Sequence, residues 1–550
     1  MSHPTAQPAA SLVCAGIHFS WPDGQPLLQD FDLVVGPGRT GLIGLNGAGK
    51  STLLRLLAGE LGPESGTVKV VGTLGHLPQN LILDADLPVA EALGIAGTRD
   101  ALHAIERGEA TEENFALVGD DWDVEERARA TLDRLGLSAV RLERRVGELS
   151  GGESVLLGLA GQILRRPDIL LLDEPSNNLD REARQHLYDA VSTWKGALVV
   201  VSHDRELLEL VDRIADLRDG EIRWHGGNFS SYEAALAVEQ EAAERMLRVA
   251  ESDVRRQQRE LVETQVKLGR RKRYGQKMFD NKREPRAVMM ERKRQAQVSS
   301  GKLRIEQEEK VTEARERLAA AESAVREDDE IRVDLAASEV PAGRTVLTLR
   351  GVRPPYTAEG VRIDLDLRGP ERVALVGGNG AGKTTLLRTI TGQLAPLAGE
   401  IDREVPMRFL PQRLDVLDDG LSVVGNVARF APSVTDNEIR ARLARFLFRG
   451  GRAEQQVATL SGGERFRATL AALMLADPAP QLLLLDEPTN NLDLASVRQL
   501  ATALVSYRGA LIVVSHDLPF LHSIGITRWL RLDRTSGITP QSPTAEYSGG

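Results

Sequence analysis

Two glycine-rich segments of the chain have the residue types and spacing of a phosphate-binding loop. Each consists of a glycine, four further residues, and then glycine-lysine followed by serine or threonine, at residues 44–51 and 377–384. The glycines let the backbone wrap around phosphate oxygens, the lysine reaches the β- and γ-phosphates, and the hydroxyl is a ligand for Mg²⁺. The sequence therefore predicts two sites for ATP with Mg²⁺. The loop residues expected to bind the nucleotide are Gly44, Asn46, Gly47, Gly49, Lys50, Ser51, Thr52, Gly377, Asn379, Gly380, Gly382, Lys383, Thr384 and Thr385.

Further along each half, an aspartate-glutamate pair ends a short apolar run. The transfer of a phosphoryl group depends mainly on positioning and charge neutralisation. The aspartate is expected to hold the Mg²⁺ shell, and the glutamate to orient or deprotonate the attacking water. A glutamine in Leu-Pro-Gln is expected to reach Mg²⁺ and the water, and a histidine in Ser-His-Asp to reach the γ-phosphate. The predicted metal ligands are Ser51, Gln79, Asp173, Thr384, Gln412 and Asp486, and the predicted catalytic residues are Glu174, Glu487, His203, His516, Gln79 and Gln412.

The segment Leu-Ser-Gly-Gly-Glu occurs twice, at residues 149–153 and 460–464. A serine before two glycines that open a helix offers backbone N–H groups and a hydroxyl to an anion. Because there are two such segments and two phosphate loops, we interpret each segment as covering the nucleotide held by the opposite half. The residues expected to do so are Ser150, Gly151, Gly152, Ser461, Gly462 and Gly463.

One aromatic residue precedes each phosphate loop by a little over 20 residues, Trp21 in the first half and Tyr356 in the second. Either side chain could stack on adenine. Ordinary strand or loop aromatics are the alternative interpretation, and it is stronger for Tyr356.

These motifs recur in one order, so the chain contains an internal repeat. His203 follows Asp173 by 30 residues, and His516 follows Asp486 by the same interval. Strand-like runs alternate with helical ones, which is typical of a mainly parallel sheet covered on both faces. We expect an α/β protein with two P-loop domains at 11–229 and 343–536, and a disordered tail at 537–550. The first repeat has a surplus of 22 residues around Thr98–Val124, interpreted as a surface insertion in preference to a docking element.

Residues 230–342, between the repeats, are rich in Glu, Arg, Gln and Ala. Apolar or small residues recur at alternating steps of three and four, which predicts two helices that pack as an antiparallel coiled coil. Such a helix over residues 231–268 would be about 57 Å long at 1.5 Å per residue. The turn is expected around 269–285. The seam positions are Ala243, Leu247, Ala250, Val254, Gln257, Leu261, Thr264 and Leu268, followed by Val311, Ala314, Leu318, Ala321 and Val325.

The end of this hairpin is basic although the chain as a whole is acidic. Residues 269–295 contain 11 Lys and Arg against 3 acidic residues, whereas the whole chain has a net charge of −10. Cations for phosphates, interleaved with aromatic rings for stacking, favour a contact with RNA over a merely solvated face. The predicted RNA-binding residues are Arg270, Arg271, Lys272, Arg273, Tyr274, Lys277, Phe279, Lys282 and Arg283.

The composition of the 550 residues limits the location and class of the protein. There is one cysteine, Cys14, so neither an intrachain disulfide nor a cysteine cluster for zinc is possible. No secretory signal and no apolar run long enough to span a membrane is visible. We expect a cytoplasmic protein without a membrane span.

The quoted motifs resemble those of the ATP-binding cassette (ABC) superfamily over nearly all of both predicted domains. In that family two cassettes close head to tail, and the Leu-Ser-Gly-Gly-Glu signature of one covers the γ-phosphate held by the other. The resemblance implies that Ser461 and Gly463 face the site of Lys50, and that Ser150 and Gly152 face the site of Lys383. The protein would then be a monomer with two intramolecular composite sites and no obligate partner chain.

Two cassettes joined by a basic helical linker resemble the ABC-F proteins. The resemblance implies binding to the 70S ribosome in the ATP state, with the linker near the P-site tRNA and the 23S rRNA of the peptidyl-transferase centre. The segment 275–285 resembles the linkers of the antibiotic-resistance branch, which acts by ribosomal protection. One departure concerns the first signature, which is followed by Ser154, Val155 and Leu156 where Arg465 and Arg467 follow the second. This difference would make the two sites unequal.

Three other functions remain open from the sequence. The chain could be a general translation factor that relieves stalled ribosomes, or a DNA-associated ABC ATPase with the hairpin on branched or damaged duplex. It could also energise a separate membrane transporter. The absence of a C-terminal DNA-binding module counts against the DNA-associated ATPase.

Overall fold

The structure is a computed structural model. It describes residues 10–21, 24–79, 81, 84–177, 179–218, 220–280, 286–324, 338–413, 415–490 and 492–541. In the hairpin, the backbone alone is described at 272, 275–276, 278–280, 286–289, 292–293, 296–297, 300–301, 304 and 322–324. The contacts within the chain define two units, a body of 1–230 with 330–550 and a hairpin of 231–329.

The first cassette consists of a mainly parallel sheet and a smaller antiparallel sheet. The large sheet has the strand order β5-β6-β7-β3-β8-β9, and only the pair β8/β9 is antiparallel. The antiparallel sheet has the order β2-β1-β4. The strands are β1 (Ser11–Ser20), β2 (Pro26–Val35), β3 (Gly38–Gly44), β4 (Ser65–Val71), β5 (Leu74–Leu77), β6 (Ile169–Asp173), β7 (Ala197–Val201), β8 (Arg213–Arg218) and β9 (Glu221–Gly226). The helices are α1 (Lys50–Leu57), α2 (Val89–Ala92), α3 (Ala96–Glu106), α4 (Glu112–Val118), α5 (Val124–Arg134), α6 (Gly151–Arg165), α7 (Arg181–Ser192) and α8 (Arg205–Leu208).

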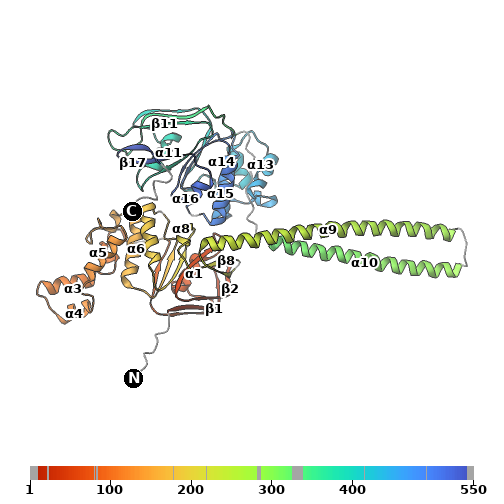
Figure 1. Ribbon diagram of the computed structural model, residues 1–550, viewed down its shortest axis with the longest axis horizontal. Helices are drawn as coiled ribbons and strands as arrows, with labels where there is room; N and C mark the ends of the chain where they lie inside the picture. Colours follow the sequence, from red (N-terminus) through yellow and green to blue (C-terminus); the bar gives the residue numbers. More distant parts are fainter. Residues whose placement is uncertain are drawn as a thin grey trace, which may run out of the picture. The chain divides into compact units, whose positions relative to one another are not determined.

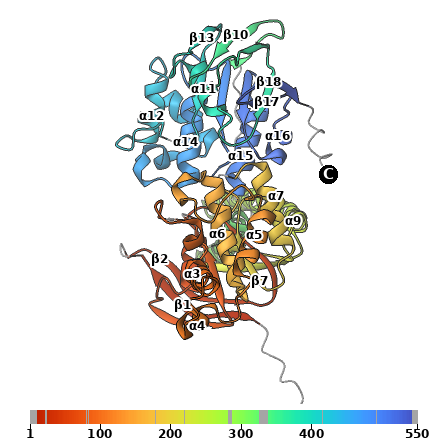
Figure 2. The same cartoon turned by 90° about the vertical axis from the view of Figure 1, so that its left-hand side faces the viewer.

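The second cassette repeats this topology strand for strand. Its large sheet has the order β14-β15-β16-β12-β17-β18 and its small sheet the order β11-β10-β13. Figure 2 shows β10 and β13 at one end of the body and β1 and β2 at the other. The strands are β10 (Thr345–Arg353), β11 (Ile363–Arg368), β12 (Arg372–Val376), β13 (Ala398–Arg403), β14 (Met407–Leu410), β15 (Leu482–Asp486), β16 (Ala510–Val514), β17 (Arg528–Asp533) and β18 (Gly537–Gln541). The helices are α11 (Lys383–Thr391), α12 (Val423–Phe430), α13 (Asp436–Leu443), α14 (Gly462–Met474), α15 (Leu494–Ser506) and α16 (Leu518–Ser523).

The apolar run before each aspartate is a strand with both faces buried. In β15, Leu482 and Leu484 pack into one core with the antiparallel sheet and α11, while Leu483 and Leu485 pack into another with α12 and α14. Successive side chains of a strand point to opposite faces, so a continuous leucine run suits a sheet that is covered on both sides. The sequence expectation of an α/β fold with two P-loop domains is therefore correct, and Asp486 lies where a fully buried strand ends.

The structure differs from the sequence expectation at the end of the chain. Residues 537–541 form β18, which pairs antiparallel with β17, although disorder was expected from 537 onward. The edge of the large sheet offers backbone partners that a Gly/Pro/Ser-rich composition does not reveal. Residues 542–550 lie outside the described residues. The surplus of the first repeat forms α3 and α4, whose ends are joined by residues 107–111.

The hairpin unit consists of α9 (Phe229–Asp280) and α10 (Arg286–Ala324), which run side by side in Figure 1. Arg317 of α10 pairs with Asp253 of α9 at 3.2 Å. Val254, Val311 and Ala314 are buried, and the other described seam positions are less exposed than their neighbours. The predicted seam thus lies between the helices. The turn was expected from 269, but α9 continues to Asp280, because the strong helix formers around Gly269 outweigh a cost of about 1 kcal/mol for one glycine.

Candidate nucleotide sites

Both phosphate loops have the same backbone conformation. Gly44 and Gly377 adopt φ values of 154° and 152°, and a Cβ at either position would come within 2.5 Å or 2.4 Å of a carbonyl oxygen of β8 or β17. Only glycine fits there, so the loop can pass close to the neighbouring strand. The ammonium of Lys50 donates to the Gly44 carbonyl at 2.8 Å, and that of Lys383 donates to the Gly377 carbonyl at 2.6 Å. Each lysine is therefore held beneath its own loop.

The aspartates that end β6 and β15 have buried oxygen atoms without protein partners. Asp173 Oδ1 and both carboxylate oxygens of Asp486 are buried and accept no hydrogen bond from the described residues. Burial raises the pKa of both aspartates above its ordinary value. Carboxylate and hydroxyl oxygens are the ligands that Mg²⁺ prefers. These aspartates with Ser51 and Thr384 fit the coordination shell of a magnesium ion.

Each glutamate that follows its aspartate contacts a histidine from the neighbouring strand end. Glu174 Oε1 lies 3.2 Å from His203 Nε2, and Glu487 Oε1 lies 3.4 Å from His516 Nε2. Both glutamates have left-handed backbone conformations, with φ of 48° and 47°. Such strain in a non-glycine residue is held by the surrounding structure, here by an N–H···O bond from each glutamate N–H to Val201 or Val514.

Burial moves the protonation equilibria of these pairs toward the neutral forms. It raises the pKa of Glu487 to about 7 and lowers the pKa of His516 to about 3. In the first pair, burial likewise raises the pKa of Glu174 and lowers that of His203. A carboxyl group with a pKa near neutrality is suited to exchange a proton with water. The histidines are neutral near pH 7, so their rings act by hydrogen bonding and not by charge.

The two signature segments begin the helices α6 and α14. Ser150 is the N-cap of α6, its hydroxyl accepts from the Glu153 N–H at 3.3 Å, and the Glu153 carboxylate accepts from the Ser150 N–H at 2.7 Å. Ser461 and Glu464 make the same capping box. This reciprocal arrangement satisfies two of the free N–H groups at a helix start. The serine and glutamate therefore also have a role in helix stability.

The loops that precede α7 and α15 contact the phosphate loop of the opposite cassette. The Asn46 N–H donates to Asp493 at 2.9 Å, and the Asn379 N–H donates to Asp180 at 3.2 Å. A Cβ at Gly462 would lie 4.0 Å from the Asn46 side chain, which brings the second signature up to the first phosphate loop. The first signature makes no matching approach at Gly151, where a Cβ would meet nothing within 4 Å. The two sites therefore face opposite cassettes but are not equally closed.

The remaining predicted residues are distributed unevenly around the sites. A cleft of about 270 Å³ contains Gln412 together with Lys383, Thr384 and Glu487. Gln79 is exposed just beyond β5. Trp21 packs edge-on against Phe19 with ring centroids 5.5 Å apart. The side chain of Tyr356 is 81% exposed, so contact with adenine stays a prediction for both aromatics.

The predicted RNA-binding residues lie at the end of α9. Arg270, Arg271, Arg273, Tyr274 and Lys277 are exposed. The side chains of Lys272 and Phe279 are not described, and Lys282 and Arg283 lie outside the described residues.

Sequence reasoning missed three residues at the sites. Asp180 and Asp493 follow Asn-Asn-Leu in both repeats, so their repetition was a signal that could have identified them. Arg184 lies in the same cleft as Lys383 and Glu487, yet it belongs to the other cassette. Nothing in the sequence marks it, because the second repeat has Val497 at the corresponding position.

The fold and the paired sites define a tandem-cassette ATPase, and comparisons with known proteins agree. The model of the family described as "ABC transporter" matches residues 28–177 and 361–490. The chain is 35% identical over 537 residues to the tylosin resistance ATP-binding protein TlrC of Streptomyces fradiae, covering 90% of this chain and 92% of TlrC. It is 34% identical over 533 residues to "Probable ATP-binding protein YheS" of Escherichia coli strain K12, covering 92% of this chain and 77% of that protein. The chain belongs to the ABC transporter family of ATP-binding proteins and is an ATPase of the ABC-F type.

Solved structures share the fold. The RNase-L inhibitor aligns with a TM-score of 0.55 and 19% identity, over 96% of this chain and 90% of that one. The archaeal ribosome recycling factor aABCE1, in its complex with the ribosomal stalk protein aP1, aligns with a TM-score of 0.55 and 18% identity, over 96% and 89%. Among the helices that the structure describes, none is both long and apolar enough to cross a membrane.

Proposed function

We propose that this ATPase binds the 70S ribosome in its ATP state and places the hairpin tip on RNA near the P-site tRNA and the peptidyl-transferase centre. Its most specific role would be antibiotic resistance by ribosomal protection, in which the tip remodels the drug site. Both composite sites would lie within one chain in the cytoplasm, and no partner chain would be needed.

The observation that carries this proposal is the exposed cationic end of α9. Arg270, Arg271, Arg273 and Lys277 are all exposed within two helical turns, and the ring of Tyr274 among them is 67% exposed. Guanidinium and ammonium groups bind phosphates, and an exposed ring can stack on an unpaired base. In a chain with a net charge of −10, this local excess of cations selects for a polyanion.

The relatives support the biological role. TlrC is named for resistance to tylosin, and it matches this chain over nearly its whole length. A neighbour in fold, aABCE1, is named as an archaeal ribosome recycling factor. YheS carries no resistance in its name, so a general translation factor that relieves stalled ribosomes is the alternative within the same class.

The chemistry of the sites follows from the residues of the chain. Lys50 and Lys383 would neutralise the γ-phosphate, and Ser51, Asp173, Thr384 and Asp486 would hold Mg²⁺, with Gln79 and Gln412 completing the shell. When bound, Mg²⁺ supplies positive charge to the transferring phosphoryl group. Glu174 and Glu487 would take a proton from the attacking water, while His203 and His516 orient those carboxylates.

A trapping experiment tests ribosome binding. Glu174→Gln combined with Glu487→Gln should retain ATP binding, abolish hydrolysis and leave the protein co-sedimenting with 70S ribosomes in ATP and Mg²⁺. Adding Lys50→Ala and Lys383→Ala to this variant removes the phosphate contacts and should release the protein. If the trapped variant sediments free of ribosomes, the proposed function is wrong.

Two further assays separate the alternatives. Expression in a sensitive host should raise the tolerated concentration of tylosin or of another drug that binds near the peptidyl-transferase centre. Unchanged drug tolerance together with ribosome trapping would favour the general translation factor. Preference for branched duplex DNA over ribosomes in a competition gel-shift would favour the DNA-associated ATPase.

A further inference from the structure

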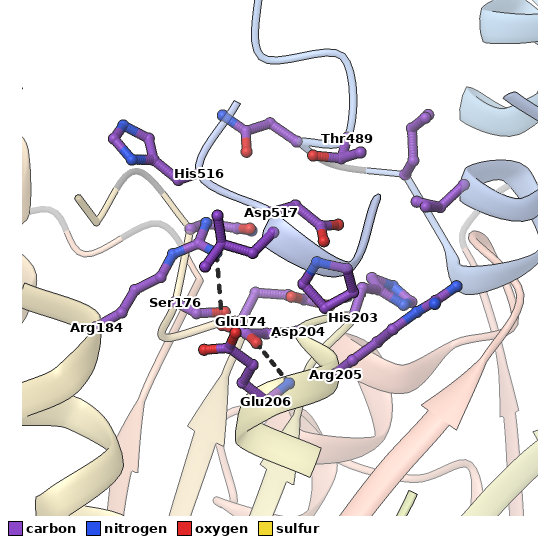
Figure 3. A pocket seen from close by; sticks show the side chains of 16 residues that line it. Glu174, Ser176, Arg184, His203, Asp204, Arg205, Glu206, Thr489, His516 and Asp517 are labelled. Carbon is purple, nitrogen blue, oxygen red and sulfur yellow. Dashed lines mark hydrogen bonds and ion pairs between the residues drawn. The ribbon is translucent and has the colours of Figure 1, made fainter. Parts of the chain in front are cut away.

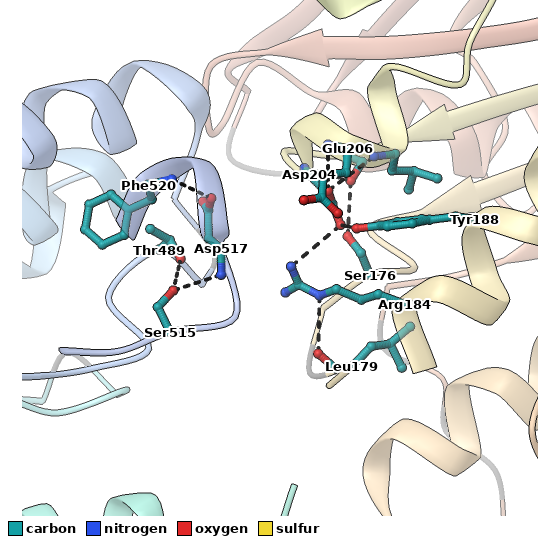
Figure 4. A network of polar contacts seen from close by, with 12 residues as sticks. Ser176, Leu179, Arg184, Tyr188, Asp204, Glu206, Thr489, Ser515, Asp517 and Phe520 are labelled. Atoms are coloured by element: carbon teal, nitrogen blue, oxygen red, sulfur yellow. Dashed lines mark hydrogen bonds and ion pairs between the residues drawn. The ribbon is translucent and has the colours of Figure 1, made fainter. Parts of the chain in front are cut away.

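Arg184 extends from α7 of the first cassette into the polar region between the cassettes. Its side chain is 15% exposed. Its Nε donates to the Leu179 carbonyl at 3.3 Å, and its Nη1 lies 3.7 Å from Asp204 Oδ2. The Tyr188 hydroxyl donates to the same Asp204 oxygen at 2.7 Å. Figure 4 shows the guanidinium held by these contacts on the side that faces Asp517 and Thr489 of the second cassette.

The same guanidinium contributes to the second nucleotide site. Arg184 lines the cleft that contains Lys383, Thr384, Glu487 and His516. Its charge acts on both Glu487 and His516. Figure 3 shows Arg184 between the Glu174–His203 region of the first site and His516 of the second. The first cassette thus adds a cation to the catalytic end of the opposite site.

The first nucleotide site has no equivalent cation from α15. Arg184 is the fourth residue after Asp180, and the fourth residue after Asp493 is Val497, which is 5% exposed. Val497 borders the central cavity on the side of Glu174 and His203. The two repeats match at the phosphate loop, the aspartate, the glutamate and the histidine. They differ at this position, where an arginine faces one site and a valine the other.

We propose that Arg184 is a positioning residue for ATP hydrolysis in the second site, supplied in trans by the first cassette. In that site the oxygen of the attacking water bonds to the γ-phosphorus, the bond to the β–γ bridging oxygen breaks, and the water proton passes to Glu487. ADP and inorganic phosphate result. Arg184 holds the Glu487 carboxylate toward the water, and its contact with Asp204, next to His203, couples this geometry to the first site. The second site is therefore the faster of the two.

Site-resolved kinetics test this role. Glu174→Gln leaves the second site to turn over, and Glu487→Gln leaves the first. Arg184→Val, which copies the residue of the second repeat, should lower kcat about tenfold or more in the Glu174→Gln background. In the Glu487→Gln background the loss should be at least fivefold smaller. The KM for ATP should change little in either, because Arg184 acts on the water and not on nucleotide binding.

Two matched variants separate positioning from helix stability. Gln185→Val introduces the same side chain at the neighbouring exposed position of α7 and should leave kcat in both backgrounds within about twofold of its parent. Arg184→Lys keeps the charge and should recover part of the lost rate. Equal losses at the two sites after Arg184→Val, or no loss at the second, would overturn the proposal.

Some tandem ATPases stop entirely when one site is inactivated, so a second readout is needed. In Arg184→Val with both glutamates intact, one turnover of photoreactive 8-azido-ATP labels each cassette with either triphosphate or diphosphate. The proposal expects the diphosphate share on peptides of the second cassette to fall relative to wild type. An unchanged share there would refute it. None of these measurements involves ribosomes, so they stand apart from the trapping experiment.

Discussion

At the scale of single residues, the buried Glu487–His516 pair controls how the second site responds to pH. The ordinary pKa of a glutamate, 4.5, is raised to about 7 for Glu487 by burial. The neutral carboxyl therefore stabilises the fold fully below pH 4.5, and this contribution is lost as the pH rises through about 7. Glutamine cannot ionise, so Glu487→Gln keeps the contribution at every pH.

We predict that Glu487→Gln raises the melting temperature relative to wild type more at pH 8.5 than at pH 5. The difference corresponds to at most about 3 kcal/mol of unfolding free energy for a shift of this size. Calorimetry with a chelator and without nucleotide measures it. His516 titrates in both proteins, so its opposite dependence on pH cancels. A melting-temperature difference that does not vary with pH would contradict the assignment.

A second prediction at this scale concerns the contact between Asp493 and the first phosphate loop. Asp493→Ala removes the acceptor of the Asn46 N–H and the N-cap of α15 together, whereas Asp493→Ser keeps a capping oxygen. We expect Asp493→Ala to cost about 1 kcal/mol in stability, with Asp493→Ser less affected. Both variants should weaken nucleotide retention at the first site, as measured by cassette-resolved photolabelling. Equal retention in both variants and wild type would show that the contact is incidental.

At the scale of elements, the seam of the hairpin decides whether α9 and α10 hold together. Val254 is 8% exposed, whereas Val249 on the same helix is 67% exposed. An aspartate at 254 would bury an unpaired charge, while one at 249 remains hydrated. We predict that Val254→Asp speeds hydrogen exchange in 243–268 and 307–321 by about 100-fold, corresponding to about 3 kcal/mol. Val249→Asp should leave exchange near wild type, and equal effects would rule out the seam.

At the scale of the whole molecule, the tip cations should determine the salt dependence of ribosome binding. Replacing Arg270, Arg271, Arg273 and Lys277 with glutamine should weaken binding of the trapped variant. If all four contact phosphates of single-stranded RNA, the slope of log affinity against log salt should fall in magnitude by about 3. Arg248→Gln with Arg259→Gln, two exposed cations of α9 outside the tip, is the control. A slope unchanged by the tip variant would show that binding resides elsewhere.

Much of the molecule was predictable because its signals are local. The phosphate loops, the aspartates that end β6 and β15, and the hairpin seam each follow from spacing within one segment. The helical extension to Asp280 and strand β18 were not predicted. In both places composition suggested a break, while helix formers on either side of Gly269 and a free sheet edge next to β17 favoured regular structure.

The sequence by itself determined the chemistry of each half, since loop, aspartate, glutamate and histidine recur with equal spacing in both repeats. Only the tertiary structure decided what each half receives from the other. Asp493 meets Asn46 across 447 residues, and Arg184 reaches the cleft of Glu487, because the cassettes face each other in space. Spacing within a repeat carries no information on such contacts, so the inequality between Arg184 and Val497 becomes visible only when the two halves are packed together.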